Sequence, residues 1–115
     1  MERTPPPRQN KLQRMQTRLD HIALIVDNPQ EAADWYMNQF GGSLLYCDET
    51  WAFVQLDNIK LAFVMKGLHP AHFAFKVGDF DEGETIKEHR DNTLSVYKKD
   101  PWGNIYELIK YPEKT

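Results

Sequence analysis

Two short stretches of this sequence resemble each other, and they constrain the fold more than any other feature. They are HIALIV at residues 21–26 and HFAFKV at residues 72–77, about fifty positions apart. Extended to HIALIVDNPQEA and HFAFKVGDFDEG, the two share His, Ala, Val and Glu at matching positions. Both stretches have the apolar and β-branched content of strands. The repeat therefore predicts two copies of one supersecondary unit.

The residues after the first stretch predict one helix and three strands. DNPQEAADWYMNQFGG, residues 27–42, offers Asp27 or Asn28 as a cap, a proline in the first turn and a glycine stop. The runs SLLYCD, TWAFVQL and IKLAFVM, at residues 43–48, 50–56 and 59–65, are typical of strands separated by short turns.

The second half predicts a shorter version of the same series. We expect a strand at residues 72–77, a short polar helix at 79–90, a strand at 93–99, a DPWGN turn and a last strand at 105–111. The predicted fold class is α+β. Two tandem βαβββ-type modules form a curved mixed sheet, or half-barrel, with the second module shortened by about one strand.

Length and charge set the domain organisation and exclude some functions. A chain of 115 residues suits one domain, predicted at 19–112 with modules at about 19–66 and 71–112. Residues 1–18 hold five basic residues and one acid, or +4, and predict a flexible arm. The net charge of −3 leaves −7 for the rest, which argues against nucleic-acid binding. No apolar run suits a membrane, and one cysteine fits the cytoplasm.

Three polar residues of the predicted strands form a candidate metal site. Strand alternation puts His21 on one face with Ala23, and His72 on the corresponding face with Ala74. Glu107 is an acid inside an apolar strand, where an unpaired charge is costly. Two imidazoles and one carboxylate suit Fe, Zn, Ni, Mn or Co as a divalent ion, with coordination positions left open. The alternative is that both histidines are structural.

Other residues have weaker claims to a function. Trp51, Phe53 and Phe63 could line a substrate pocket, although strand aromatics commonly belong to the core. His69 could be a fourth ligand or a gate residue, or else a solvated loop residue. Lys60 is expected to face solvent.

The motifs resemble the vicinal oxygen chelate superfamily, which includes glyoxalase I, bleomycin-resistance proteins, methylmalonyl-CoA epimerase and extradiol dioxygenases. The similar pieces are LDHIALIV, a helix with WY, HFAFKV and DPWGNIYELI, within residues 19–111. The resemblance implies metal ligands on the first, fourth, fifth and eighth strands. His21, His72 and Glu107 match three of these, whereas the fourth-strand position falls near Ala62, which is not an acid. Glyoxalase I has glutamate there, and extradiol dioxygenases use two histidines and one glutamate.

The leading hypothesis is an enzyme with a divalent metal that acts on a small, vicinally oxygenated substrate, as a lyase or isomerase or, with iron, as a dioxygenase. The resemblance also implies a homodimer, which could cover the open side of the second module. The alternative is a metal-free, bleomycin-resistance-like protein that binds a small molecule. A third possibility is a decayed domain with a regulatory or scaffold role.

Overall fold

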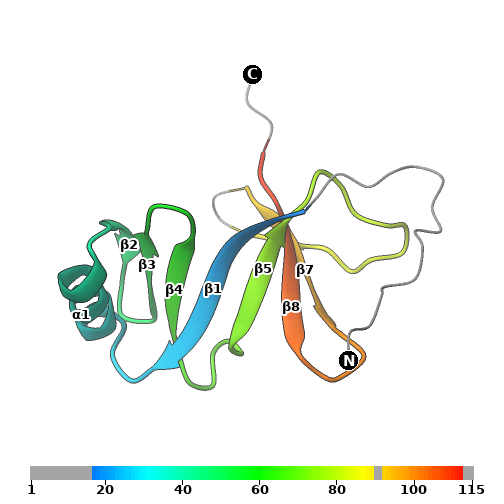
Figure 1. The fold of residues 1–115 in the computed structure, drawn as a ribbon. Coiled ribbons are helices and arrows are strands. Elements are labelled where there is room, and N and C mark those ends of the chain that lie inside the picture. The colour runs from blue at the N-terminus through cyan, green and yellow to red at the C-terminus, as the bar shows by residue number, and fades with distance from the viewer. Residues whose placement is uncertain (1–16, 90–91, 113–115) are drawn as a thin grey trace, which may run out of the picture.

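The two repeated stretches lie side by side at the centre of an eight-stranded mixed sheet (Figure 1). This computed structural model describes residues 17–89 and 92–112. The helix is α1 (Pro29–Phe40), and the strands are β1 (Arg18–Val26), β2 (Ser43–Cys47), β3 (Trp51–Gln55), β4 (Lys60–Met65), β5 (His72–Lys76), β6 (Lys87–Glu88), β7 (Leu94–Lys99) and β8 (Ile105–Lys110). The predicted α+β class with a curved mixed sheet is confirmed.

The strand order shows how the sequence repeat becomes a structural repeat. The order is β2-β3-β4-β1-β5-β8-β7-β6, so each half of the sheet runs outward from its own first strand. β1 is parallel to β4, β5 is parallel to β8, and the two first strands pair with each other in antiparallel orientation. The two halves are thus joined at the repeated histidine strands.

The first half is built as the sequence predicts. Asn28 caps α1 by accepting a hydrogen bond from the backbone N–H of Glu31 at 3.0 Å. The helix covers β2, β3 and β4, and the buried core joins Ala33 of the helix to four strand residues: Ala52, Val54, Leu61 and Phe63. Gly42 then lets the chain pass close to β3, because a Cβ at this position would lie 2.7 Å from the carbonyl oxygen of Gln55.

In the second half, the predicted helix at residues 79–90 is wrong. The described residues 77–86 form turns and loop, followed by the two-residue strand β6. The segment has too few apolar side chains for a buried helical face, and Gly83 adopts a left-handed φ of +82°. An ion pair of 2.8 Å between Glu84 and Lys98 ties the loop to β7. The described residues of this module therefore contain no helix, and its second strand is present in vestigial form.

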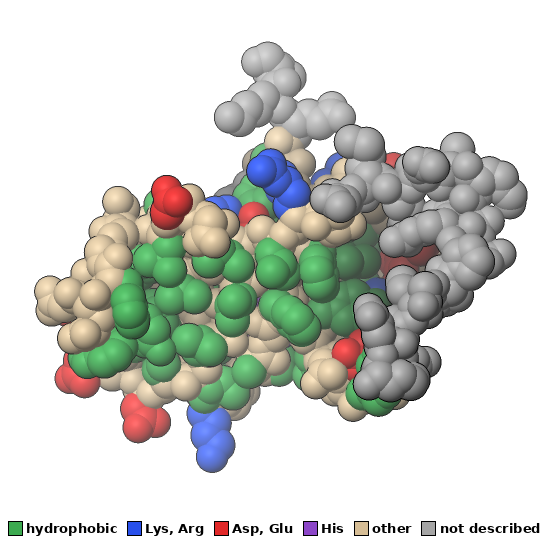
Figure 2. Space-filling view, in the orientation of Figure 1, with side chains coloured by type: hydrophobic (Ala, Val, Ile, Leu, Met, Phe, Trp, Pro, Cys, Tyr) green, Lys and Arg blue, Asp and Glu red, His purple; other side chains and the backbone are tan. Residues whose placement is uncertain are grey.

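Hydrophobic side chains gather on one side of the sheet (Figure 2). In Figure 2 they lie across the middle of that side, and none of the described histidines is visible there.

The predicted arm at residues 1–18 lies outside the described residues as far as residue 16, and β1 begins at Arg18. The described part of the chain contains no helix with the length and apolar character that crossing a membrane requires.

Candidate metal centre

Strand register brings the three predicted ligands together on one side of the sheet. In the antiparallel pairing of β1 with β5, His21 lies opposite Ala74 and His72 lies opposite Ala23. In the parallel pairing of β5 with β8, Glu107 lies beside Ala74. All three polar residues are buried, with 4–8% of their surface exposed. The two alanines therefore leave the space that the two imidazoles and the carboxylate occupy.

The distances within this group fit one divalent ion. Glu107 Oε1 lies 3.1 Å from His72 Nε2 and 3.3 Å from His21 Nε2. One potential ligand atom from each residue lies within 4.8 Å of the others. Two ligand atoms in adjacent positions around an ion, each bonded at about 2.1 Å, lie about 3.0 to 3.4 Å apart. The two distances to Glu107 thus match those between neighbouring ligands of one ion.

Hydrogen bonds to the other ring nitrogens determine which atoms face the centre. His21 Nδ1 donates to Asp20 Oδ2 at 2.8 Å, and His72 Nδ1 donates to the carbonyl oxygen of Pro70 at 2.8 Å. Neither partner can donate, so the proton of each neutral imidazole lies on Nδ1 and its Nε2 presents a lone pair. Both lone pairs point at the Glu107 carboxylate, which also only accepts. Such a buried group of acceptors requires a cation, either a proton or a metal ion.

The electrostatics of the pair His21–Glu107 agree with this requirement. Burial alone would raise the pKa of Glu107, but hydrogen bonds and charge from His21 and His72 lower it to about 2. Burial alone would lower the pKa of His21, but hydrogen bonds to Asp20 and Glu107 outweigh burial and raise it. Without a metal, the centre therefore binds a proton more tightly than free imidazole does.

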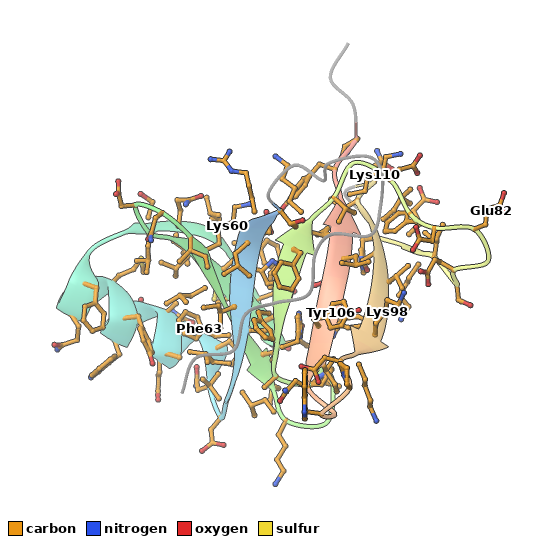
Figure 3. The ribbon with its side chains drawn as sticks, turned by 45° about the vertical axis from the view of Figure 1, so that its right-hand side comes forward. Lys60, Phe63, Glu82, Lys98, Tyr106 and Lys110 are labelled. Atoms are coloured by element: carbon orange, nitrogen blue, oxygen red, sulfur yellow. The ribbon has the colours of Figure 1, made fainter. Side chains whose placement is uncertain are left out.

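Asp20 is the functional neighbour that sequence reasoning missed. The β1–β5 pairing shifts register between Leu19 and His21, and this bulge allows Asp20 to approach the side chain of the residue that follows it. Its carboxylate also accepts from Lys60 Nζ at 3.1 Å, and its pKa falls to about 2, because these hydrogen bonds outweigh burial. We expected Lys60 to face solvent, but its ammonium group instead lies against the buried Asp20 carboxylate (Figure 3). The sequence did offer one signal for this role, since Asp20 is an acid directly before a candidate histidine ligand.

The predicted substrate-binding aromatics divide between the two sides of the sheet. Phe53 packs edge-on against His21, with ring centres 5.4 Å apart, and Trp51 lies 5.2 Å from Phe53. The structure does not bring Phe63 to this site. Phe63 is fully buried beneath α1 and contacts Tyr36. Successive side chains of β4 point to opposite faces, and it is the neighbouring Ala62 that faces the metal centre.

Tyr97 on β7 borders the centre opposite Phe53, and sequence reasoning did not find it. Its ring packs edge-on against His72, with centres 5.1 Å apart, and it pairs with Glu107 in the β7–β8 register. Burial, and then the charge of Glu107, raise the pKa of its hydroxyl, which therefore keeps its proton.

The fourth family position and the linker histidine contribute no ligand. Ala62 lies beside Ala23 on β4, so the centre is open on that side. His69 is exposed and does not belong to the ligand group found among residues 17–89 and 92–112. Three protein ligands with open positions are the arrangement of catalytic metal sites, whereas structural sites are closed.

Comparison with known proteins identifies the family. The model of the Glyoxalase/Bleomycin resistance protein/Dioxygenase superfamily matches residues 18–113. Among curated protein sequences, none matches significantly.

Several solved structures share the fold. Methylmalonyl-CoA epimerase from Streptomyces coelicolor, in complex with 2-nitronate-propionyl-CoA, has a TM-score of 0.65 at 15% identity, over 84% of this chain and 99% of that one. The epimerase from Mycobacterium tuberculosis has 0.65 at 18%, over 84% and 89%. The hypothetical protein BH1468 from Bacillus halodurans has 0.68 at 15%, over 88% and 99%. These identities establish the fold alone, and the family match shows that the chain belongs to the Glyoxalase/Bleomycin resistance protein/Dioxygenase superfamily.

Proposed function

We propose that this chain is a metal-dependent enzyme whose His21, His72 and Glu107 hold one divalent ion of the Fe, Zn, Ni, Mn or Co type. The observation that carries the proposal is the convergence of two imidazole lone pairs on a buried carboxylate, at 3.1 and 3.3 Å. Three buried acceptors that face one another are costly unless a cation lies between them. The buried group instead has the donor types and spacing that a cation needs.

The proposed substrate is a small molecule with two neighbouring oxygens. When bound, the ion would supply Lewis-acid stabilisation of the charge that develops on a substrate oxygen. Phe53 and Trp51 offer an apolar wall beside His21, and they orient the rest of the substrate and exclude water. On the opposite side, the Tyr97 hydroxyl holds its proton and can donate a hydrogen bond. This assignment includes Trp51 and Phe53 as substrate-binding residues and leaves Phe63 out.

Family and neighbours support a small-molecule substrate. Structural neighbours are described with methylmalonyl-CoA and 2-nitronate-propionyl-CoA, both of which carry oxygens that an ion can chelate. We further infer one domain at residues 19–112, with modules at 19–66 and 71–112 on either side of the site. Homodimer formation, cytoplasmic location, and lyase, isomerase or dioxygenase chemistry stay predictions.

A chelator titration tests the proposed function. The full-length protein is loaded with Co(II), and acetohydroxamate, which presents two adjacent oxygens, is added while visible absorption is recorded. We expect a saturable spectral change in wild type and in His69→Ala, which alters an exposed histidine. His72→Ala should show none, because it removes a ligand. A wild-type spectrum that does not respond to the chelator would show that the ion has no open positions and would overturn the substrate proposal.

A metal-free small-molecule binding protein is the second candidate. The contacts between Trp51, Phe53 and Tyr46 favour it, because they form an aromatic surface next to the centre, with ring centres 4.9 and 5.2 Å apart. In that case, the apo protein and the metal-loaded protein should bind aromatic ligands with equal affinity, as measured by tryptophan fluorescence. Binding that requires the metal would exclude this candidate.

A further inference from the structure

A second polar cluster lies directly behind the metal centre, on the side of His21 away from Glu107. Asp20 is hydrogen-bonded to every other member of the cluster, and only 5% of its side chain is exposed. Besides the bond from His21 Nδ1, the Asp20 carboxylate accepts from Lys60 Nζ at 3.1 Å and from the Tyr111 hydroxyl at 2.8 and 2.9 Å. Lys60 Nζ is also 3.0 Å from the Tyr111 hydroxyl. Each carboxylate oxygen of Asp20 therefore has at least one hydrogen-bond donor.

Three separate parts of the sheet build this cluster. Asp20 comes from the bulge of β1, Lys60 is the first residue of β4, and Tyr111 directly follows β8. Lys60 is paired with His21 in the β1–β4 register, so its side chain starts on the side of the sheet that carries the centre. Only 22% of the Lys60 side chain is exposed, and its ammonium also lies over the Phe53 ring at 5.6 Å.

The hydrogen bonds form one chain from Lys60 through Asp20 to His21. A carboxylate that accepts from the Nδ1–H of a ligating imidazole makes the opposite nitrogen, Nε2, a stronger ligand. An ammonium on the same carboxylate draws electron density away from it and weakens this effect. The charge on Lys60 therefore opposes the influence of Asp20 on His21.

We propose that Lys60 is a positioning residue that acts through Asp20 to limit the affinity of His21 for the ion. This rests on the proposed function, since it requires that His21 is a ligand. It adds a means of setting the metal affinity, which the three ligands alone do not have. If Lys60 weakens the effect of Asp20, His21 binds the ion less tightly. The site can then exchange its ion, or accept substrate oxygens, more readily than a site in which Asp20 acts on His21 without the lysine.

Metal affinity in a double-mutant cycle tests the proposal. The full-length variants Lys60→Met, Asp20→Asn and the double variant are compared with wild type by competition of Zn(II) with a chelator. Lys60→Met should bind Zn(II) about 3- to 10-fold more tightly, and Asp20→Asn about 10- to 100-fold more weakly. In the Asp20→Asn background, Lys60→Met should change nothing further. A direct repulsion between the lysine charge and the ion would persist in that background.

Lys76→Met is the matched control, because Lys76 lies over the same Tyr111 ring, at 5.4 Å, on the same side of the sheet. It should leave Zn(II) affinity within about 2-fold of wild type. Lys60→Gln serves as a second variant if Lys60→Met does not fold, as judged by circular dichroism.

A second readout uses the Co(II) protein. Its proton NMR spectrum should show shifted imidazole N–H signals, and Lys60→Met should move the His21 signal and leave the His72 signal in place. An unchanged or weakened affinity in both Lys60 variants would overturn the proposal, as would tightening that persists without Asp20. If wild type binds neither Zn(II) nor Co(II), the proposed function itself has failed. If wild type binds them and the Lys60 variants match it, only this inference has failed.

Discussion

At the scale of single residues, strand register explains why each repeated histidine is followed two places later by alanine. Each alanine lies opposite the histidine of the other strand, and both alanines are buried. Alternation of side chains was enough to predict that His21, His72 and Glu107 share one side of the sheet. It could not reveal Asp20, because alternation assigns that residue to the other side, and only the bulge changes this. The structure places Phe63 in the core beneath α1, the alternative that the sequence left open for the strand aromatics.

Filling one alanine site should disable the centre. Ala74 is fully buried between His21 and Glu107 in the strand register, so Ala74→Leu should displace the imidazole or the carboxylate and abolish metal uptake. Overpacking should also lower the free energy of unfolding by about 1 to 3 kcal/mol. The control is Ala52→Leu, which overpacks the core beneath α1. It should cost similar stability in urea unfolding and retain the metal, and equal metal loss in both variants would argue against the explanation.

The stability of the metal-free protein should depend on pH in a defined window. The raised pKa of His21 means a stabilisation that is complete below about pH 6.5 and is lost as pH rises through the folded-state pKa. The lowered pKa of Glu107 means a stabilisation that is present above about pH 4.5 and is lost as pH falls toward 2. The pair therefore contributes most between these two values.

Urea unfolding of the metal-stripped wild type and of Glu107→Gln, from about pH 4 to about pH 9, measures this contribution. We expect the difference in unfolding free energy to be largest between the two limits and to shrink at alkaline pH. A difference that is constant over the whole range would show that no proton is held between His21 and Glu107.

At the scale of elements, the helix of the first module was predictable, whereas the loop that stands in place of a second helix was not. The segment at residues 27–42 combines a cap, a proline, an apolar stripe and a glycine stop, and these local signals agree. The segment at 79–90 is acidic, and its place in the repeat suggested a helix. In the structure, ion pairs from Glu84 to Lys98 and from Asp79 to Lys110, at 2.8 and 3.6 Å, hold the described loop instead. Tertiary partners of this kind are invisible in a single sequence.

The N-terminal cap of α1 should contribute to stability and not to metal binding. Asn28→Ala removes the side-chain acceptor of the Glu31 N–H, which should lower the free energy of unfolding by about 1 kcal/mol. Asn28→Asp, which keeps an acceptor, should retain wild-type stability. Thermal unfolding together with Zn(II) affinity checks both points. Loss of Zn(II) affinity in Asn28→Ala would contradict this prediction, because it would mean that the helix cap and the metal centre are coupled.

At the scale of the whole molecule, the symmetry of the sheet places one centre where the two halves meet. Both first strands contribute a histidine there, and the last strand of the second half contributes the carboxylate. The corresponding position of the first half is Ala62 on β4, so the symmetry is incomplete in the ligand set. The repeat predicted the joining of two modules, whereas the pairing of β1 with β5 could not be derived from strand patterns. The strand faces predicted the three residues of the site, and the resemblance to the family agreed with them.

The central claim is that this junction holds a metal ion, and the most direct test is elemental analysis of the purified, untagged full-length protein. Wild type, His72→Ala and His69→Ala are measured together after reconstitution with divalent metals. We predict about one equivalent of metal in wild type and in His69→Ala, and none above background in His72→Ala, because three ligands are needed to hold the ion. Wild-type protein without metal, or metal that His72→Ala retains in full, would contradict the claim.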